Sequence, residues 1–204
     1  MCTFSERWGW RPSGSNPCRL VKHVPEKKRR RYVTDAEAIR IEAELKKREA
    51  TQPLAVAFIN LLYYTGARVG EIAKAKWSDL DGNIISLPDS KSGYPRTIYL
   101  NEPAMEVLEQ LPRGSGTITG IKDPKACWVA VRDAAGCPDL RLHDLRHNFA
   151  SDGVSAGLSL TQTGEILGHK NPSTTMGYAH LIKQKGQAAV EAVGLDSKRR
   201  RKGG

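Results

Sequence analysis

The sequence predicts a mainly α-helical domain with one small antiparallel β-hairpin. Apolar residues recur at helical spacing through most of the chain from residue 35 onward. Two short alternating segments, 83–87 and 96–100, flank a turn-rich loop and have the pattern of a hairpin. The chain of 204 residues is 39% hydrophobic and 26% charged, which is typical of one globular domain with its own core.

Capping residues, Gly and Pro divide the chain into successive helices. Thr34 and Glu37 have the spacing of a capping box and predict a helix over 35–49. Pro53 opens a helix that is apolar almost all round and stops at Gly66, so we expect it at the centre of the core. Further helices are predicted for the segments 68–80, 102–111, 123–135, 143–156, 159–167, 171–181 and 183–193.

Lysine and arginine gather at the two ends of the chain. The formal net charge is +10, and nine of the 32 basic residues lie in 1–34 and five in 196–204. The part between them is close to neutral. Two interpretations stay open: the ends are solvated tails, or they are basic arms that neutralise DNA phosphates.

Cysteine spacing and hydropathy argue against other classes of protein. Cys2, Cys18, Cys127 and Cys137 are too scattered for a zinc or redox motif, so we expect incidental thiols in a reducing compartment. No apolar run approaches the roughly 18 residues that cross a bilayer, and the first residues lack a secretory pattern. We therefore expect a cytoplasmic protein that does not bind membranes.

The segment 65–71, TGARVGE, is the first candidate for chemistry. Gly66 permits a tight turn, and Arg68 begins a helix where backbone N–H groups favour an anion. Glu71 lies three residues further on, so it shares the face of Arg68 and can hold its guanidinium. The alternative is an ordinary surface ion pair.

The segment 143–147, HDLRH, is the second candidate. His143 and Arg146 are three residues apart and share a helix face, whereas Leu145 faces the core. Together they supply a proton-transfer group and a planar clamp for phosphate. His147 is expected to point elsewhere. The alternative is a polar helix face with a hydrogen-bonded histidine.

Two further candidates follow from turns and loops. Gly168 ends one helix, His169 occupies the turn, and Pro172 opens the helix that is predicted to carry Tyr178. Lys91 lies in the hairpin loop, from which a lysine can enter a groove as a general acid. Taken singly, a tyrosine at the position of Tyr178 is usually a core residue, and a loop lysine such as Lys91 is normally only solvated.

These residue types together suit the transfer of a DNA phosphodiester to a hydroxyl nucleophile. Arginine and histidine donors stabilise the charge that develops on the non-bridging oxygens. A lysine can protonate the leaving 5′-oxygen. A phenol with a pKa near about 10 needs the surrounding positive charge to ionise at neutral pH. The sequence has no Walker loop, zinc motif or carboxylate cluster, so we expect no cofactor and no metal.

The same residues, in the same order, resemble the catalytic domain of the tyrosine recombinase (phage integrase) family. The resemblance covers roughly 16–193 and includes LRHNFAS, LGHKNPSTT and GYAHL, with Tyr178 nine residues after His169. It implies the DNA breaking-rejoining fold and an integrase that forms a 3′-phosphotyrosine. It also implies double-stranded DNA as the partner of a homotetramer, with a monomer in free solution. The implied catalytic residues are Arg68, Lys91, His143, Arg146, His169 and Tyr178, supported by Glu71.

The resemblance also predicts how the chain is organised. Residues 1–33 are expected to be a basic linker and the remnant of an upstream core-binding domain, 34–195 the catalytic domain, and 196–204 a basic tail. A shortened chain is therefore expected. Position 148 is Asn where many relatives carry Thr, and position 177 is Gly where Arg is common. Two alternatives stay open: a DNA-binding remnant that no longer recombines, and a relaxing activity like that of type IB topoisomerases.

Overall fold

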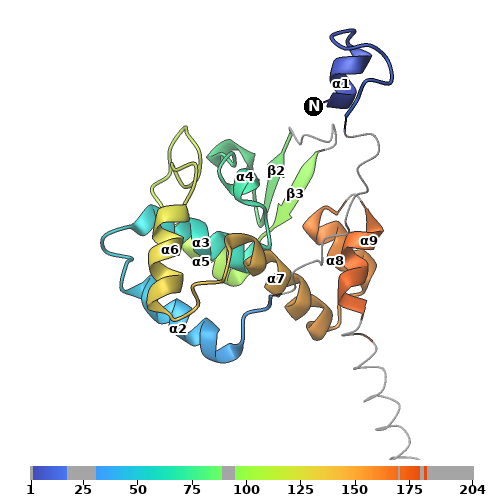
Figure 1. Ribbon diagram of the computed structural model, residues 1–204. Coiled ribbons are helices and arrows are strands. Elements are labelled where there is room, and N and C mark those ends of the chain that lie inside the picture. Colours follow the sequence, from blue (N-terminus) through green and yellow to red (C-terminus); the bar gives the residue numbers. More distant parts are fainter. Residues whose placement is uncertain (1, 18–30, 89–94, 170, 180–181, 183–204) are drawn as a thin grey trace, which may run out of the picture. The chain divides into compact units, whose positions relative to one another are not determined.

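The computed structural model describes residues 2–17, 31–88, 95–169, 171–179 and 182. The chain divides into two compact units, Met1–Arg30 and Arg31–Gly204. The first unit contains the helix α1 (Cys2–Arg7) (Figure 1). In this unit the ring centroid of Trp8 lies 5.5 Å from that of Phe4 and 5.1 Å from that of Trp10. The expectation that residues 1–33 are a basic linker and the remnant of a core-binding domain stays a prediction.

The second unit is mainly helical with a small antiparallel sheet, as predicted. It also contains two 3₁₀ turns, η1 between α4 and β1 and η2 after α9. The bounds of these elements are α2 (Asp35–Lys46), α3 (Pro53–Thr65), α4 (Val69–Ile72), η1 (Trp77–Asp79), β1 (Leu80–Asp81), β2 (Ile84–Leu87), β3 (Arg96–Tyr99), α5 (Glu102–Glu109), α6 (Lys125–Ala134), α7 (Leu142–Ala156), α8 (Leu160–Leu167), α9 (Pro172–Thr175) and η2 (Met176–Tyr178).

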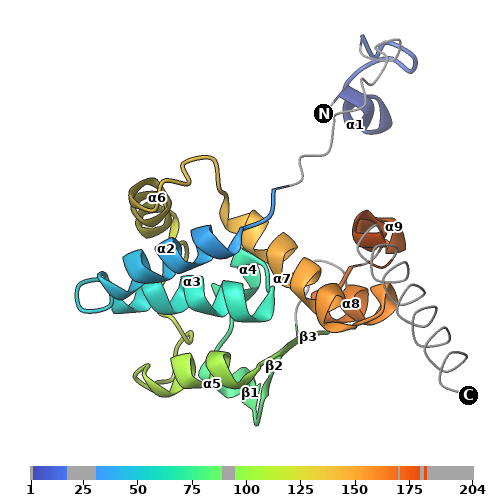
Figure 2. The same cartoon turned by 90° about the horizontal axis from the view of Figure 1, so that it is seen from below.

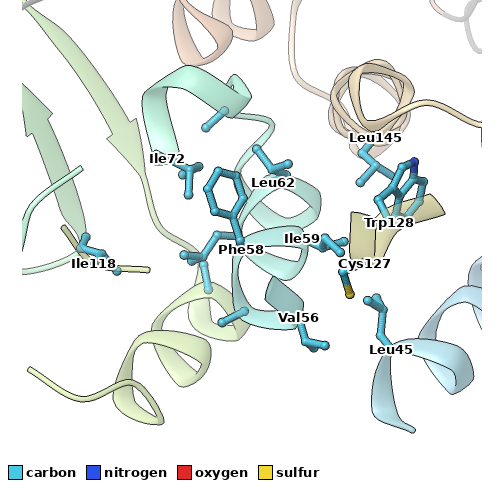
Figure 3. Packing of buried hydrophobic residues seen from close by; sticks show 14 of the residues in the cluster. Leu45, Val56, Phe58, Ile59, Leu62, Ile72, Ile118, Cys127, Trp128 and Leu145 are labelled. Atoms are coloured by element: carbon cyan, nitrogen blue, oxygen red, sulfur yellow. The ribbon is translucent and has the colours of Figure 1, made fainter. Parts of the chain in front are cut away.

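The first two helices of this unit begin and end as the sequence predicts. The Thr34 hydroxyl accepts from the backbone N–H of Glu37, whose carboxylate accepts in return from the N–H of Thr34. Helix α3 begins at Pro53 and ends at Gly66, which adopts the left-handed conformation with φ of 63°. Its apolar side chains fill the centre of the core, where Figure 3 shows Phe58, Ile59 and Leu62 among residues of several helices.

The sheet contains the predicted hairpin and one strand more. Strands β2 and β3 pair antiparallel with Ile85 opposite Ile98, and both side chains are buried against the helices. Strand β1 pairs with β2 on the other side and was not predicted. The hairpin loop that carries Lys91 lies outside the described residues.

The helix predicted over 68–80 is wrong in length. Helix α4 has only four residues, and the chain then passes through η1 into β1. The carbonyl of Ala75 accepts from the N–H of Ile118 at 2.8 Å, and Lys76 forms a bridge with Thr117. These contacts with a distant segment replace the hydrogen bonds that would continue the helix.

The helix predicted over 171–181 is also shorter than expected. Helix α9 ends at Thr175, and Tyr178 lies on the following 3₁₀ turn η2 rather than in an α-helix. The predicted helix 183–193 and the basic tail fall outside the described residues.

A second, smaller apolar cluster lies beside the main core. Helix α7 contacts both α3 and α8, and Figures 1 and 2 show it running between them. Its C-terminal half packs against α8 and η2, with Phe149 partly buried at the edge. The buried residues of this cluster are Ala150, Val154, Leu167 and Tyr178.

Cys127 and Cys137 are free, buried thiols, as predicted. Burial raises the pKa of the Cys127 thiol. Among the helices that the structure describes, none has both the length and the apolar composition of a membrane span. The same part of the chain gathers no three His, Cys, Asp or Glu residues around a possible metal position.

Candidate active site

A pocket of about 350 Å³ opens where the N-terminus of α4, helix α7, the α8–α9 turn and η2 meet. It brings together five of the residues that the sequence singled out. Its lining residues are Arg68, His143, Arg146, His147, His169, Asn171, Thr174 and Tyr178. Lys91 belongs to the hairpin loop outside the described residues, so its position relative to the pocket stays a prediction.

Arg68 is the N-cap residue of α4 and is held as the sequence predicts. Its Nη1 donates to Glu71 Oε1 at 2.7 Å, and its backbone N–H donates to Glu71 Oε2 at 2.8 Å. Its Nη2 also donates to the carbonyl of Gly168 at 3.1 Å. Because 45% of its side chain remains exposed, the guanidinium is fixed in direction and still accessible to an anion.

Arg146 lies on α7 and is almost completely buried. Its Nη1 donates to the carbonyl of Gly66 at 2.7 Å, and its Nη2 donates to the carbonyl of Leu167 at 2.6 Å. Burial, and then the nearby charge of Arg68, lower the pKa of Arg146 to about 10. The guanidinium therefore remains charged at neutral pH in surroundings that exclude most water.

A third arginine, Arg96 on β3, was missed by the sequence analysis. Its Nη2 donates to the carbonyl of Ile166 at 2.7 Å, and its Nε lies 3.6 Å from Glu71 Oε1. A Cβ on Gly168 would lie 2.8 Å from this Nε, so only a glycine lets Arg96 pass so close to the backbone. Burial lowers the pKa of Arg96.

The three arginines thus donate to the carbonyls of three consecutive residues at the end of α8. Arg96, Arg146 and Arg68 bind Ile166, Leu167 and Gly168, respectively. The last carbonyls of a helix lack partners within the helix and carry partial negative charge. We call this arrangement the arginine clamp. It joins β3, α4 and α7 to the turn that holds His169.

His169 follows directly after the arginine clamp. Its backbone N–H donates to the carbonyl of Gly164 at 2.8 Å, and its Nδ1 lies 2.9 Å from the hydroxyl of Thr175. Burial, and then the charges of Arg146 and Arg68, lower the pKa of His169 to about 4. The free pocket therefore contains a neutral imidazole, and a bound anion would favour its protonation.

The expectation that His147 points elsewhere is wrong. Its Nδ1 lies 2.6 Å from the hydroxyl oxygen of Tyr178, and its ring meets that of His143 edge to face at 4.9 Å. Residues three and four positions after His143 flank the same face of a helix, so both Arg146 and His147 reach the pocket. Burial is the main cause that lowers the pKa of His143 and of His147.

Tyr178 combines two environments. Its ring belongs to the smaller apolar cluster, and only 4% of the residue is exposed. Its hydroxyl meets His147 at the pocket. The apolar ring therefore holds the phenol oxygen at the edge of a cavity lined by Arg68 and Arg146. Such a cavity suits a phosphate placed between guanidinium donors and a hydroxyl nucleophile.

The fold is the DNA breaking-rejoining fold of tyrosine recombinase catalytic domains, and the chain belongs to the Phage integrase family, whose model matches residues 31–185. It is 34% identical over 147 residues to tyrosine recombinase XerC of Roseiflexus castenholzii. The match covers 61% of this chain and 46% of the relative. It is 29% identical over 184 residues to the integrase of Escherichia phage P2, covering 87% of this chain and 51% of the relative.

A solved structure, the catalytic domain of bacteriophage HP1 integrase, has a similar fold. The TM-score is 0.66 at 26% identity, and the match covers 80% of this chain and 95% of that domain. The crystal structure of XerA recombinase matches with a TM-score of 0.59 at 23% identity, covering 81% of this chain and 66% of that one. The chain spans about half the length of the curated relatives it matches.

Proposed function

We propose that this chain is a tyrosine-type DNA strand transferase that cleaves and rejoins DNA through a covalent 3′-phosphotyrosine at Tyr178. One observation carries the proposal: the Tyr178 hydroxyl meets a pocket lined by Arg68, Arg146 and His169. The family match and the likeness to an integrase catalytic domain support it.

The proposed reaction has two steps of the same chemistry, cleavage of a strand by Tyr178 and rejoining by a 5′-hydroxyl. The phenol oxygen of Tyr178 forms a bond with the scissile phosphorus, and the bond from phosphorus to the 5′-oxygen breaks. Arg68, Arg146 and His169 donate to the non-bridging oxygens, where charge develops. Lys91 gives the 5′-oxygen its proton, and His143 assists proton transfer. A 5′-hydroxyl then attacks the phosphotyrosine and restores the phosphodiester, so the bond energy is conserved without a cofactor or metal.

The proposed partner is double-stranded DNA, and the proposed assembly on it is a homotetramer. Solved structures of similar fold include a lambda integrase dimer bound to a core site and a lambda integrase tetramer bound to a Holliday junction. At 20% identity these two structures support the fold alone. The basic segments 1–34 and 196–204 supply phosphate contacts in this proposal.

Trapping of the covalent intermediate tests this function. The protein is incubated with duplexes taken from DNA that flanks its gene, each nicked so that the short cleaved strand diffuses away. We expect an adduct that survives denaturing electrophoresis and that maps to Tyr178 by peptide mass spectrometry. Tyr178→Phe should abolish the adduct and leave DNA binding within a few-fold.

A matched control is Tyr99→Phe, because Tyr99 is exposed on β3 and does not line the pocket. This variant should form the adduct as the parent protein does. Binding of every duplex without any adduct would favour the DNA-binding remnant instead. Relaxation of supercoiled DNA without exchange of strands between duplexes would favour the topoisomerase-like activity.

A further inference from the structure

Helix α7 carries His147 in addition to His143, and His147 contacts the hydroxyl of Tyr178, the proposed nucleophile. His147 Nδ1 lies 2.6 Å from the phenol oxygen, which is the length of a short hydrogen bond. Tyr178 is buried apart from its access to the pocket, and His147 is half-buried beside it. A general base must lie within hydrogen-bond distance of the atom whose proton it removes, and the separation between His147 Nδ1 and the Tyr178 oxygen meets this requirement.

The other two imidazoles of the pocket are placed for different contacts. His169 Nδ1 lies 2.9 Å from the Thr175 hydroxyl, at the far end of the arginine clamp. The ring of His143 meets that of His147 edge to face, with the centroids 4.9 Å apart and an angle of 86° between the ring planes. His147 therefore connects the phenol to the ring of His143.

The surroundings of His147 favour the neutral ring, which is the form that accepts a proton. Burial is the largest cause that lowers the pKa of His147, Asp144 opposes it, and Arg146 adds to it. A neutral ring with its proton on Nε2 accepts at Nδ1 from the phenol. The charged and titratable groups around His147 are His143, Asp144 and Arg146 on its own helix, and Arg68, His169 and Tyr178 from the other elements that line the pocket.

We propose that His147 is the general base that takes the phenolic proton as Tyr178 attacks the phosphate. The inference rests on the proposed function. The O–H bond of Tyr178 breaks, the proton passes to Nδ1 of His147, and the phenol oxygen bonds to phosphorus as the 5′-oxygen leaves. In rejoining, His147 returns the same proton to the phenolate when a 5′-hydroxyl displaces it. The positive charge of the protonated ring arises beside the phosphate, which carries the opposite charge.

The test uses the cleavage site mapped above, in a duplex whose scissile 5′-oxygen is replaced by sulfur. A thiolate leaves without a proton, so the contribution of the general acid is bypassed and the rate reports on the nucleophile. We expect the single-turnover rate of the parent protein to be level from about pH 7 to 9. His147→Asn should be slower by roughly 10²–10⁴ at pH 7.

His147→Asn is chosen because an asparagine oxygen can accept a hydrogen bond near the position of Nδ1 without taking a proton. If His147 is the base, the variant should gain about tenfold in rate per pH unit, because hydroxide then ionises the phenol. If His147 only orients Tyr178, the variant should keep the level profile of the parent, which would overturn the proposal. His143→Asn removes the other imidazole of α7. Because His143 assists proton transfer in the proposed reaction, this variant should be slower than the parent, but its profile should remain level. If His143→Asn rather than His147→Asn gained rate with pH, the proposal would also be overturned.

A second measurement needs no active variant. Nitrogen-15 NMR of labelled histidine, assigned by loss of the signal in His147→Asn, reports which ring nitrogen carries the proton. We expect the Nε2–H form at pH 7, and an Nδ1–H form that donates to Tyr178 would contradict the proposal. If the parent protein forms no covalent adduct with any duplex, the proposed function fails and this inference fails with it. If His147→Asn forms the adduct at the rate of the parent protein, His147 is not the general base, but the proposed function stands.

Discussion

Arg96 donates from β3 to the carbonyl of Ile166, 70 residues further along the chain, at 2.7 Å. Arg96 is 8% exposed, and its Nε finds no hydrogen-bond partner although Glu71 lies 3.6 Å away. Burying a guanidinium that contacts only carbonyls and one carboxylate costs free energy, because burial disfavours the charged form. We conclude that Arg96 is a positioning residue that fixes the end of α8, and with it His169.

Arg96→Met should lower both stability and the rate of DNA cleavage. The change leaves the Ile166 carbonyl without its charged donor, and we expect a loss of about 2–3 kcal/mol in the free energy of unfolding. Arg96→Lys keeps the charge without the planar fork, so it should recover only part of the loss. Urea unfolding and single-turnover cleavage check both variants. Equal stability of Arg96→Met and the parent would contradict the positioning role.

Gly168→Ala should be costlier than the same change at Gly136. Both glycines have positive φ, 63° and 71°, so alanine at either position suffers a strained backbone of about 1–2 kcal/mol. A Cβ at Gly168 would also meet Arg96 at 2.8 Å, whereas nothing lies within 4 Å at Gly136. We expect an additional loss of about 1–3 kcal/mol at Gly168 from this overlap.

Gly136→Ala is therefore the matched control for backbone strain. Urea unfolding of the two variants under the same conditions gives the difference directly. Equal losses at both positions would mean that Arg96 moves away at little cost, and that the arginine clamp tolerates a side chain at Gly168.

Acidification should destabilise the protein partly through His169. Its pKa is about 4 in the folded protein and about 6.5 in an unfolded chain. Between these values the unfolded state binds more protons, so the free energy of unfolding falls as the pH falls from about 6.5 to 4. We expect roughly 1–2 kcal/mol less stability at pH 5 than at pH 7.5 from this residue. Urea unfolding of His169→Gln should show a smaller decrease over the same range, and an equal decrease would exclude His169 as its source.

Each subunit should cleave with its own tyrosine. The ring of Tyr178 packs among Ala150, Val154 and Leu167 of the same chain, and its hydroxyl lies at the pocket of the same chain. A mixture of Arg146→Ala and Tyr178→Phe proteins should therefore form no covalent adduct on the trapping substrate. A mixture of the parent with Tyr178→Phe is the positive control. Restored adduct in the first mixture would mean that Tyr178 is exchanged between subunits.

Local signals in the sequence predicted much of the fold. The capping box at Thr34 and the stop at Gly66 are decided by neighbouring residues, and both are confirmed. The helix predicted over 68–80 is wrong because its end is decided by a contact between Ala75 and Ile118. Such pairing with a distant segment leaves no trace in the helical pattern itself.

The candidate site was predicted less completely than the fold. The convergence of Arg68, Arg146 and Tyr178 agrees with the residues that the sequence singled out. The expectation for His147 is wrong because its spacing of four from His143 brings it to the pocket, although it is adjacent to Arg146. Arg96 was missed, although strand alternation places it on the same face as the buried Ile98. A charged residue at an inward position of a strand is the signal that would have found it.

The convergence of three arginines on the end of α8 has a consequence for the chain as it is synthesised. Arg68 and Arg96 are synthesised well before α8, and Arg146 only shortly before it. Until α8 docks, Arg96, Arg146 and Arg68 lack the carbonyls of Ile166, Leu167 and Gly168 that hold them, so the geometry that orients a phosphate is incomplete. We therefore expect the proposed cleavage activity to arise only after α8 and the following Tyr178 are both in place.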